Sequence, residues 1–180
     1  NDQHKTSINP SLADKNTLKD ISAIAMRCGG CGAKVGANVL NRAISELKPA
    51  PRDDILIGLH EPDDAAVVEV PAGKVMVHTV DYFRSFIDDP YIFGQIAANH
   101  SLSDIFAMGA EPQSALAIAT VPFGIEVKAE DTLRPLMAVA MLILHGANTT
   151  VVGGHTRAAA KLALGVSVSD LADEHESKRT

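Results

Sequence analysis

The chain has 180 residues, 46% of them hydrophobic and 21% charged, which are the proportions of a soluble globular protein with a core of its own. Its formal net charge of −6 excludes the broad basic surface that duplex nucleic acid requires, so we expect no nucleic-acid partner. No apolar run approaches the roughly 20 residues that a membrane helix needs, and we therefore expect no membrane span.

The first part of the chain is predicted to be an arm followed by a glycine-rich loop. Residues 1–26 are polar and mixed in charge, which is typical of a flexible arm or interdomain linker. The chain begins with Asn1 and shows no signal-peptide pattern, so we expect a piece of a longer polypeptide. Four glycines within residues 27–36 predict a loop whose backbone can approach a ligand closely. The two cysteines, Cys28 and Cys31, do not form a secreted disulfide framework, which favours a cytoplasmic protein.

The next segment is predicted to contain one helix and three strands. Apolar residues at helical spacing indicate a helix over residues 37–47. Short strands are expected over 54–59 and 65–70, separated by an acidic turn. A Pro-Ala-Gly connection then leads into a strand over 74–83, where β-branched residues dominate.

A long central helix is predicted after that strand. Asp89 is expected to cap its N-terminus, and Pro90 suits the first helical position. The helix should end at Met108, since Gly109 stands where a left-handed C-terminal cap falls.

The last part is predicted to add strands and one more helix. An apolar strand is expected over 114–121, then a helix over 132–145 with Asp131 as its cap and Gly146 at its end. Strands over 149–152 and 162–168 should flank a tight polar loop at 153–156, and residues 171–180 read as a frayed tail. This order of elements predicts an α+β fold, a mixed β-sheet with helices packed on one face, within a single domain over 27–170.

Cys31 and Lys34 are the first candidates for chemistry. A cysteine in a glycine loop near a lysine lies in a positive field that stabilises the thiolate, and such a lysine can also hold a phosphate. The Cys28-x-x-Cys31 spacing leaves three other interpretations open, namely half of a zinc site, a redox pair and an inert loop.

Carboxylates at the ends of predicted elements are the second group of candidates. Asp63 and Asp64 occupy the acidic turn, Asp81 ends the central strand, and Asp104 lies near the C-terminus of the central helix. Hard oxygen ligands of this kind suit Mg²⁺, which commonly bridges nucleotide phosphates. The alternatives are solvated turn acids and, for Asp104, an exposed pair with His100 one helical turn earlier.

The third group is the loop that contains Gly154, His155 and Thr156. Its glycines permit close approach of an anion and Thr156 can donate a hydrogen bond, although a plain hairpin turn fits the same residues. Asn99 and Ser103 share a face of the central helix and can reach the same site.

Several segments together resemble a known family. In chain order they are Cys31-Gly32-Ala33-Lys34, Asp63-Asp64-Ala65-Ala66-Val67, Thr79-Val80-Asp81-Tyr82-Phe83, Asn99 with Ser103-Asp104-Ile105-Phe106-Ala107-Met108-Gly109, and Gly153-Gly154-His155-Thr156. They are similar to the N-terminal, ATP-binding half of selenophosphate synthetase (selenide, water dikinase). The paired aspartates and the central helix are shared with aminoimidazole ribonucleotide synthetase, thiamine-monophosphate kinase and a hydrogenase maturation factor, whereas the Cys-Gly-x-Lys loop is specific to the selenophosphate enzyme.

The resemblance implies a reaction and roles for individual residues. ATP, selenide and water would give selenophosphate, AMP and phosphate. Cys31 would be the catalytic cysteine that handles selenium, and Lys34 would act with it and contact the ATP phosphates. The residues implied to contact ATP are Lys34, Asp63, Asp81, Asp104, Gly154, His155 and Thr156. The residues implied to bind Mg²⁺ are Asp64, Asp81 and Asp104.

The resemblance also implies partners. Relatives are homodimers in which two N-terminal sheets close into a shared barrel, and a second domain completes the active site. The polar arm before Arg27 resembles a linker, which suggests a fused flavin- and pyridine-nucleotide-dependent oxidoreductase module. Two alternatives stay open: another small-molecule kinase of the same superfamily, and a silent or redox-linked binding module of a multidomain oxidoreductase.

Overall fold

The computed structural model describes residues 34–61 and 63–173. The chain divides into Asn1–Ala33 and Lys34–Thr180, and every described residue belongs to the second unit. The predicted arm, Cys28, Cys31 and the last seven residues lie outside the described part. None of the helices in the described part is both long and apolar enough to cross a membrane.

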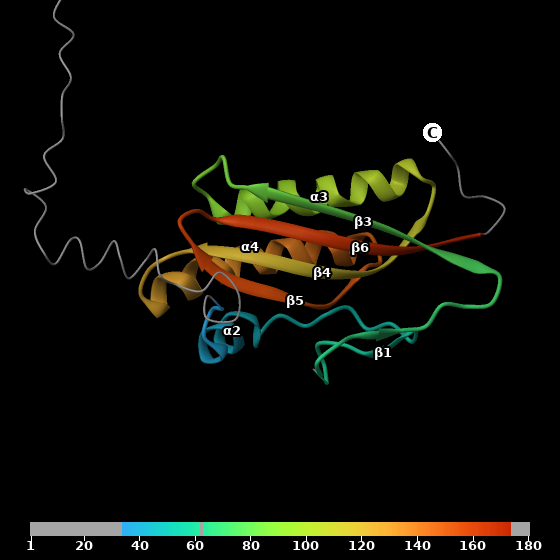
Figure 1. The fold of residues 1–180 in the computed structure, drawn as a ribbon, viewed down its shortest axis with the longest axis horizontal. Helices are drawn as coiled ribbons and strands as arrows, with labels where there is room; N and C mark the ends of the chain where they lie inside the picture. Colours follow the sequence, from blue (N-terminus) through green and yellow to red (C-terminus); the bar gives the residue numbers. More distant parts are fainter. Residues whose placement is uncertain (1–33, 62, 174–180) are drawn as a thin grey trace, which may run out of the picture. The chain divides into compact units, whose positions relative to one another are not determined.

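A four-stranded mixed sheet forms the centre of this unit (Figure 1). Its strands, in spatial order, are β3 (Lys74–Arg84), β6 (Ala163–Asp173), β4 (Glu111–Pro122) and β5 (Thr150–Ala159). β6 pairs antiparallel with both of its neighbours, whereas β4 and β5 are parallel. A parallel pair needs a crossover connection, and α4 (Glu126–Gly146) supplies it.

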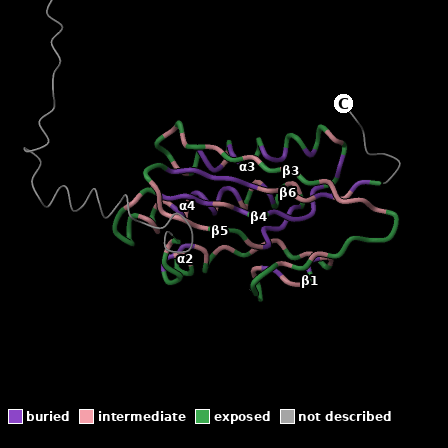
Figure 2. Tube along the Cα trace, in the orientation of Figure 1, coloured by how far each residue is buried: buried purple, intermediate pink, exposed green. Residues whose placement is uncertain are grey.

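Among the described residues, the helices cover one face of this sheet and leave the other open. Figure 1 shows α4 and α3 (Pro90–Ala107) behind the strands. Alternate residues of the strands point to this helical side, as Ala117 of β4 and Val166 of β6 do, and Figure 2 shows the burial concentrated along β4 and β6. Gly94 lets α3 approach α4, because a Cβ there would lie 2.6 Å from a methyl group of Val139. The predicted combination of a mixed sheet with helices on one face is confirmed.

The predicted start of the central helix, α3, is confirmed, and its end differs by one residue, since α3 ends at Ala107 with Met108 as the C-cap. The carboxylate of Asp89 accepts hydrogen bonds from the backbone N–H groups of Tyr91 and Ile92 at 2.8 and 3.2 Å, and Pro90 is the first helical residue. Gly109 follows the C-cap with φ +69°, the left-handed conformation expected there. Local signals at both ends were therefore sufficient to define this element.

The predicted start of the second long helix was wrong. α4 begins at Glu126, so Asp131 lies inside the helix and Ile125 is the N-cap residue. Glu130 is one reason for the additional turns, because it accepts hydrogen bonds at 2.7 Å from Arg42 of α2 (Ala37–Ile44) and at 2.7 Å from Arg134. At the other end the left-handed residue is not Gly146, which is still helical, but Asn148 with φ 57°.

The predicted loop at residues 153–156 was also wrong, since these residues lie within β5. Gly154 pairs with Ala117 of β4, and a Cβ on Gly154 would lie 1.9 Å from the Ala117 carbonyl oxygen. The two glycines therefore permit a close contact between strands rather than a turn. β6 likewise extends to Asp173, so three residues assigned to a frayed tail are paired with β3 or β4.

The elements before β3 are shorter than predicted. They are α2 (Ala37–Ile44), β1 (Ile55–Ile57) and β2 (Val67–Val68). A polar cluster attaches the β1–β2 pair to the sheet: Arg52 donates to both carboxylate oxygens of Asp54 at 2.8 and 2.7 Å, and Gln113 of β4 donates to Asp54 at 2.8 Å. Hydrogen bonds from Arg52 and Gln113 lower the pKa of Asp54 to about 2.

Asp170 is an unusual member of the core. It is completely buried on β6, and neither carboxylate oxygen has a hydrogen-bond partner within the described residues. Burial raises the pKa of Asp170 from its ordinary value of 3.8 to about 7, because an unpaired charge is costly away from water. Below about pH 7 the folded protein therefore favours the protonated carboxyl group of Asp170.

We expect Asp170 to make stability fall as the pH rises. Between pH 4 and pH 7 the unfolded chain releases this proton and the folded chain keeps it, so the free energy of unfolding should decrease by up to about 1.4 kcal/mol per pH unit. In Asp170→Asn this contribution should disappear. Urea unfolding at pH 5 and pH 8 measures it: the wild type should lose about 2 kcal/mol more than the variant. Equal losses in both proteins would contradict the assignment.

Candidate functional site

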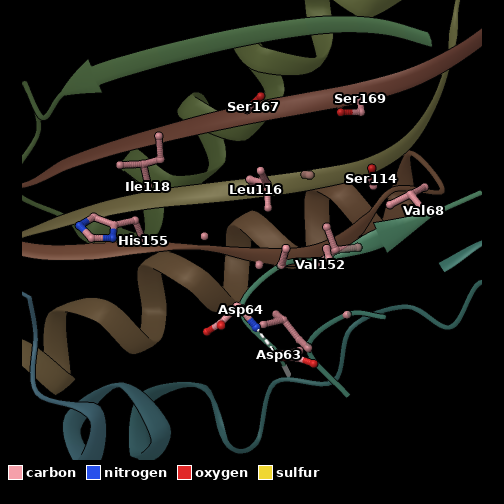
Figure 3. Close-up of a pocket in the computed structure, with 17 residues that line it drawn as sticks. Asp63, Asp64, Val68, Ser114, Leu116, Ile118, Val152, His155, Ser167 and Ser169 are labelled. Carbon is pink, nitrogen blue, oxygen red and sulfur yellow. Dashed lines mark hydrogen bonds between the residues drawn. The ribbon is translucent and has the colours of Figure 1, made fainter. Parts of the chain in front are cut away.

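A cavity of about 650 Å³ lies against the open face of the sheet, beside β5 (Figure 3). The β1–β2 connection forms one wall, and residues of β4, β5 and β6 form the floor. The polar groups in its lining are the side chains of Asp63, Asp64, Ser114, His155, Ser167 and Ser169. Acids, hydroxyls and an imidazole thus face one space that is large enough for a small ligand.

The two adjacent acids of the β1–β2 connection have different surroundings. The backbone N–H of Asp64 donates to the Asp63 carboxylate at 2.8 Å, so the side chain of Asp63 stabilises the turn. No described residue forms a hydrogen bond or ion pair with the Asp64 carboxylate. Both residues are exposed, and Figure 3 shows them next to the outer edge of β5. Asp64 is therefore the more available of the two for a cation.

The Gly-Gly-His-Thr segment supplies residues to both faces of the sheet. His155 pairs with Ile118 and lines the cavity on the open face. Thr156 pairs with Ala119, a residue of the helix-covered face, and so points to the opposite side. Gly153 and Gly154 come directly before them in the strand and leave bare backbone, where a ligand can lie close to the strand. The segment is therefore part of an edge strand of the sheet, whereas the sequence predicted a loop.

Sequence reasoning missed a polar row across the open face. Ser114 pairs with Ser169, and Ser169 pairs with His78, whose Nδ1 lies 2.9 Å from the Ser169 hydroxyl oxygen. The alternation of serine with valine in β6 was the available signal, because it places the hydroxyl groups on the face opposite the core. The sequence does not show which strands lie beside β6, so the pattern alone could not place these serines next to Ser114 or His78.

Asp81 and Asp104 lie elsewhere, between β3 and α3. Val77 and Phe83 of β3 pack against the core, so Thr79 and Asp81 point to the same helical side. The Thr79 hydroxyl donates to the Asp104 carboxylate at 3.2 Å. One carboxylate oxygen of Asp81 is buried without a hydrogen-bond partner within the described residues. These two acids thus form a second polar location beside α3.

The described residues hold no group of three His, Cys, Asp or Glu side chains close enough to bind one metal ion. The structure therefore does not bring Asp64 together with Asp81 and Asp104 in one chain. Lys34 is exposed just before α2 and does not line this cavity. Cys31 lies outside the described residues, so its position relative to either location stays a prediction.

Comparison with curated proteins finds relatives that share one name. Selenide, water dikinase of Nitratidesulfovibrio vulgaris Hildenborough is 38% identical over 149 residues, which cover 82% of this chain and 42% of the relative. Selenide, water dikinase of Clostridium botulinum Eklund 17B is 33% identical over 159 residues, with 88% and 45% covered. The chain thus spans less than half the length of these relatives.

Comparison with solved structures supports the fold. Thiamine-monophosphate kinase from Stenotrophomonas maltophilia superposes with a TM-score of 0.62 at 24% identity, over 79% of this chain and 42% of that one. The hydrogenase maturation protein HypE in complex with ATP gives a TM-score of 0.52 at 17% identity, over 82% and 42%. At these identities the likeness concerns the fold alone.

The family described as AIR synthase related protein, N-terminal domain, matches residues 62–172. This match begins at the acidic turn and includes β3, α3, β4, α4, β5 and nearly all of β6. It therefore covers the four-stranded sheet up to the last residue of β6 and both locations of acidic side chains, and the chain belongs to the family of AIR synthase related proteins as an N-terminal domain.

Proposed function

We propose that this chain is the ATP- and Mg²⁺-binding half of a selenide, water dikinase. The observation that carries the proposal is the cavity lined by Asp63 and Asp64 together with Gly154 and His155, two pairs of neighbouring residues from distant parts of the sequence. Relatives named selenide, water dikinase are 33–38% identical to this chain. The reaction would convert ATP, selenide and water into selenophosphate, AMP and phosphate.

The acidic residues fit a magnesium-dependent nucleotide site. Carboxylate oxygens are the ligands that Mg²⁺ prefers, and the ion would neutralise the phosphate charge. Asp64 is exposed, and one oxygen of Asp81 is buried without a partner within the described residues. Asp104 is oriented by Thr79. We propose these three, in the two separate locations described above, as the metal-binding residues and Lys34 as a contact to the phosphates.

The apolar residues of the open face support a homodimer. Val80 and Tyr82 of β3 are 62% and 52% exposed, and Leu116 of β4 is 44% exposed. Apolar side chains on an uncovered sheet face favour burial against another surface. We propose that a second copy covers this face and that the two sheets close into a barrel.

Titration of Mg·ATP into the chain tests the nucleotide site. We expect Asp64→Asn to weaken Mg·ATP binding at least tenfold, about 1.4 kcal/mol, because one negative ligand is lost while the shape is kept. Asp131→Asn is the matched control, since Asp131 is exposed on α4 away from the cavity. Calorimetry with and without Mg²⁺ gives both affinities. Unchanged binding by Asp64→Asn would remove this residue from the metal site.

The selenide step is tested by replacing the cysteine nucleophile in the enzyme that carries this domain. Cys31→Ser should abolish selenide-dependent formation of AMP, because a hydroxyl group does not replace a thiolate in handling selenium, and Mg·ATP binding should persist. Cys28→Ser should retain turnover. ATP consumption that needs no selenide, or full activity of Cys31→Ser, would instead favour another kinase of the superfamily.

The dimer is tested by placing a charge on the open face. Val80→Asp should shift the protein to the monomer in sedimentation velocity, because covering the face would bury an unpaired carboxylate. Leu142→Asp is the matched control, since Leu142 is also 62% exposed but lies on α4. A wild-type monomer, or a dimer that survives Val80→Asp, would refute the proposed interface.

A further inference from the structure

Another cavity, of about 470 Å³, lies at the end of the sheet where β3 and β4 finish and the β5–β6 hairpin turns. Four separate segments line it: the β3–α3 connection, the last residue of β4, α4 and the hairpin. It shares no lining residue with the cavity that contains Asp64. A pocket of this volume is large enough for a small metabolite, and nothing in the proposed nucleotide site uses it.

Two opposite charges lie in this lining without neutralising each other. Lys161 belongs to the β5–β6 hairpin and Asp88 to the β3–α3 connection, and both are exposed. No described residue forms an ion pair or hydrogen bond with either side chain, and the two do not pair with each other. A free ammonium group and a free carboxylate in one pocket are complementary to a ligand that carries both a carboxylate and an ammonium group of its own.

The hydroxyl groups in the lining favour the ammonium end of such a ligand. The Ser85 hydroxyl donates to the carbonyl oxygen of Ile87, and the Thr132 hydroxyl donates to that of Lys128 at 2.8 Å. A hydroxyl group has one proton and two lone pairs, so both oxygen atoms remain as acceptors. Together with the carboxylate of Asp88, they offer the hydrogen-bond acceptors that the three protons of an ammonium group need.

Apolar surface completes the pocket. Phe86 is 71% exposed, while its ring makes an edge contact with the buried ring of Phe93, the two centroids lying 6.4 Å apart. Pro90 and Pro122 line the same cavity. An aromatic side chain that is supported by a buried ring and open to solvent beside two prolines provides a contact surface for an aliphatic group of a ligand.

We propose that this cavity binds a free α-amino acid with an aliphatic side chain, its carboxylate on Lys161, its ammonium group on Asp88 and its side chain on Phe86. The three kinds of group in the pocket, a cation, an anion with hydroxyl acceptors and an apolar surface, correspond to the three parts of such a molecule. The inference goes beyond the nucleotide site and does not depend on it, because the two cavities have no residue in common.

Truncated ligands test which part of the molecule each group holds. Titration of the 180-residue chain with L-leucine, followed by NMR of the backbone amides, should give saturable shifts in residues 85–89 and 160–162. 4-Methylpentanoate lacks the ammonium group and 3-methylbutylamine lacks the carboxylate, so each should bind at least about threefold more weakly than L-leucine. Glycine should also bind more weakly, because it has no side chain to contact Phe86.

Two variants at exposed positions separate the two charges. Lys161→Gln should raise the Kd for L-leucine at least about threefold and leave the Kd for 3-methylbutylamine unchanged, because that ligand has no carboxylate. Asp88→Asn should raise the Kd for L-leucine by a similar factor and leave the Kd for 4-methylpentanoate unchanged. Lys128→Gln and Asp53→Asn are the matched controls, since both residues are exposed and lie outside the lining, and they should change none of these constants.

The same titrations can overturn the amino-acid site. Absence of saturable L-leucine binding by the wild type would refute it, and so would equal affinities for L-leucine and its two truncated forms. If the control variants weaken L-leucine binding as much as Lys161→Gln and Asp88→Asn do, the effect comes from net charge alone and the site is equally refuted. None of these outcomes bears on the binding of Mg·ATP, which is measured separately.

Discussion

The close backbone contact between β5 and β4 at Gly154 is the constraint on which the rest of the site depends. A methyl group on Gly154 would lie 1.9 Å from the Ala117 carbonyl oxygen, so only glycine permits this pairing. Because the pair is parallel, the chain must cross over through α4 to make it, and that crossover places α4 over the helical face. The same contact puts His155 on one face and Thr156 on the other.

The parts of the fold that sequence predicted well are those fixed by local chemistry. Asp89, Pro90 and Gly109 define the ends of α3, and each acts on backbone groups within a few residues. β5 was missed because a Gly-Gly pair usually marks a turn, and its partner strand lies more than thirty residues earlier in the chain. The start of α4 was missed for a related reason, since Glu130 is paired with Arg42 of a separate helix.

In the candidate site, too, the residue types could be predicted from the sequence, whereas their positions relative to one another could not. Motifs identified Asp63, Asp64, Gly154 and His155, and the structure places all four around one cavity. Their chemistry is visible in the sequence, whereas their proximity depends on how β5 and the β1–β2 connection meet. The separation of Asp81 and Asp104 from these residues, and the serine row beside His78, depend on strand register. No spacing in a single sequence encodes register between distant strands.

Gln113 of β4 attaches the β1–β2 pair to the sheet through only a few hydrogen bonds. Its amide reaches both sides of the β1–β2 pair, donating to the Asp54 carboxylate and to the Glu69 carbonyl oxygen at 2.8 Å each. β1 and β2 have only three and two residues, so this side chain replaces much of the backbone ladder that longer strands would provide. Short elements held by few bonds open by local fluctuation long before the whole domain unfolds. Amide hydrogens of β1 and β2 should accordingly exchange with solvent faster than those of β4 and β6, and a ligand held by Asp64 would slow that exchange by closing the turn.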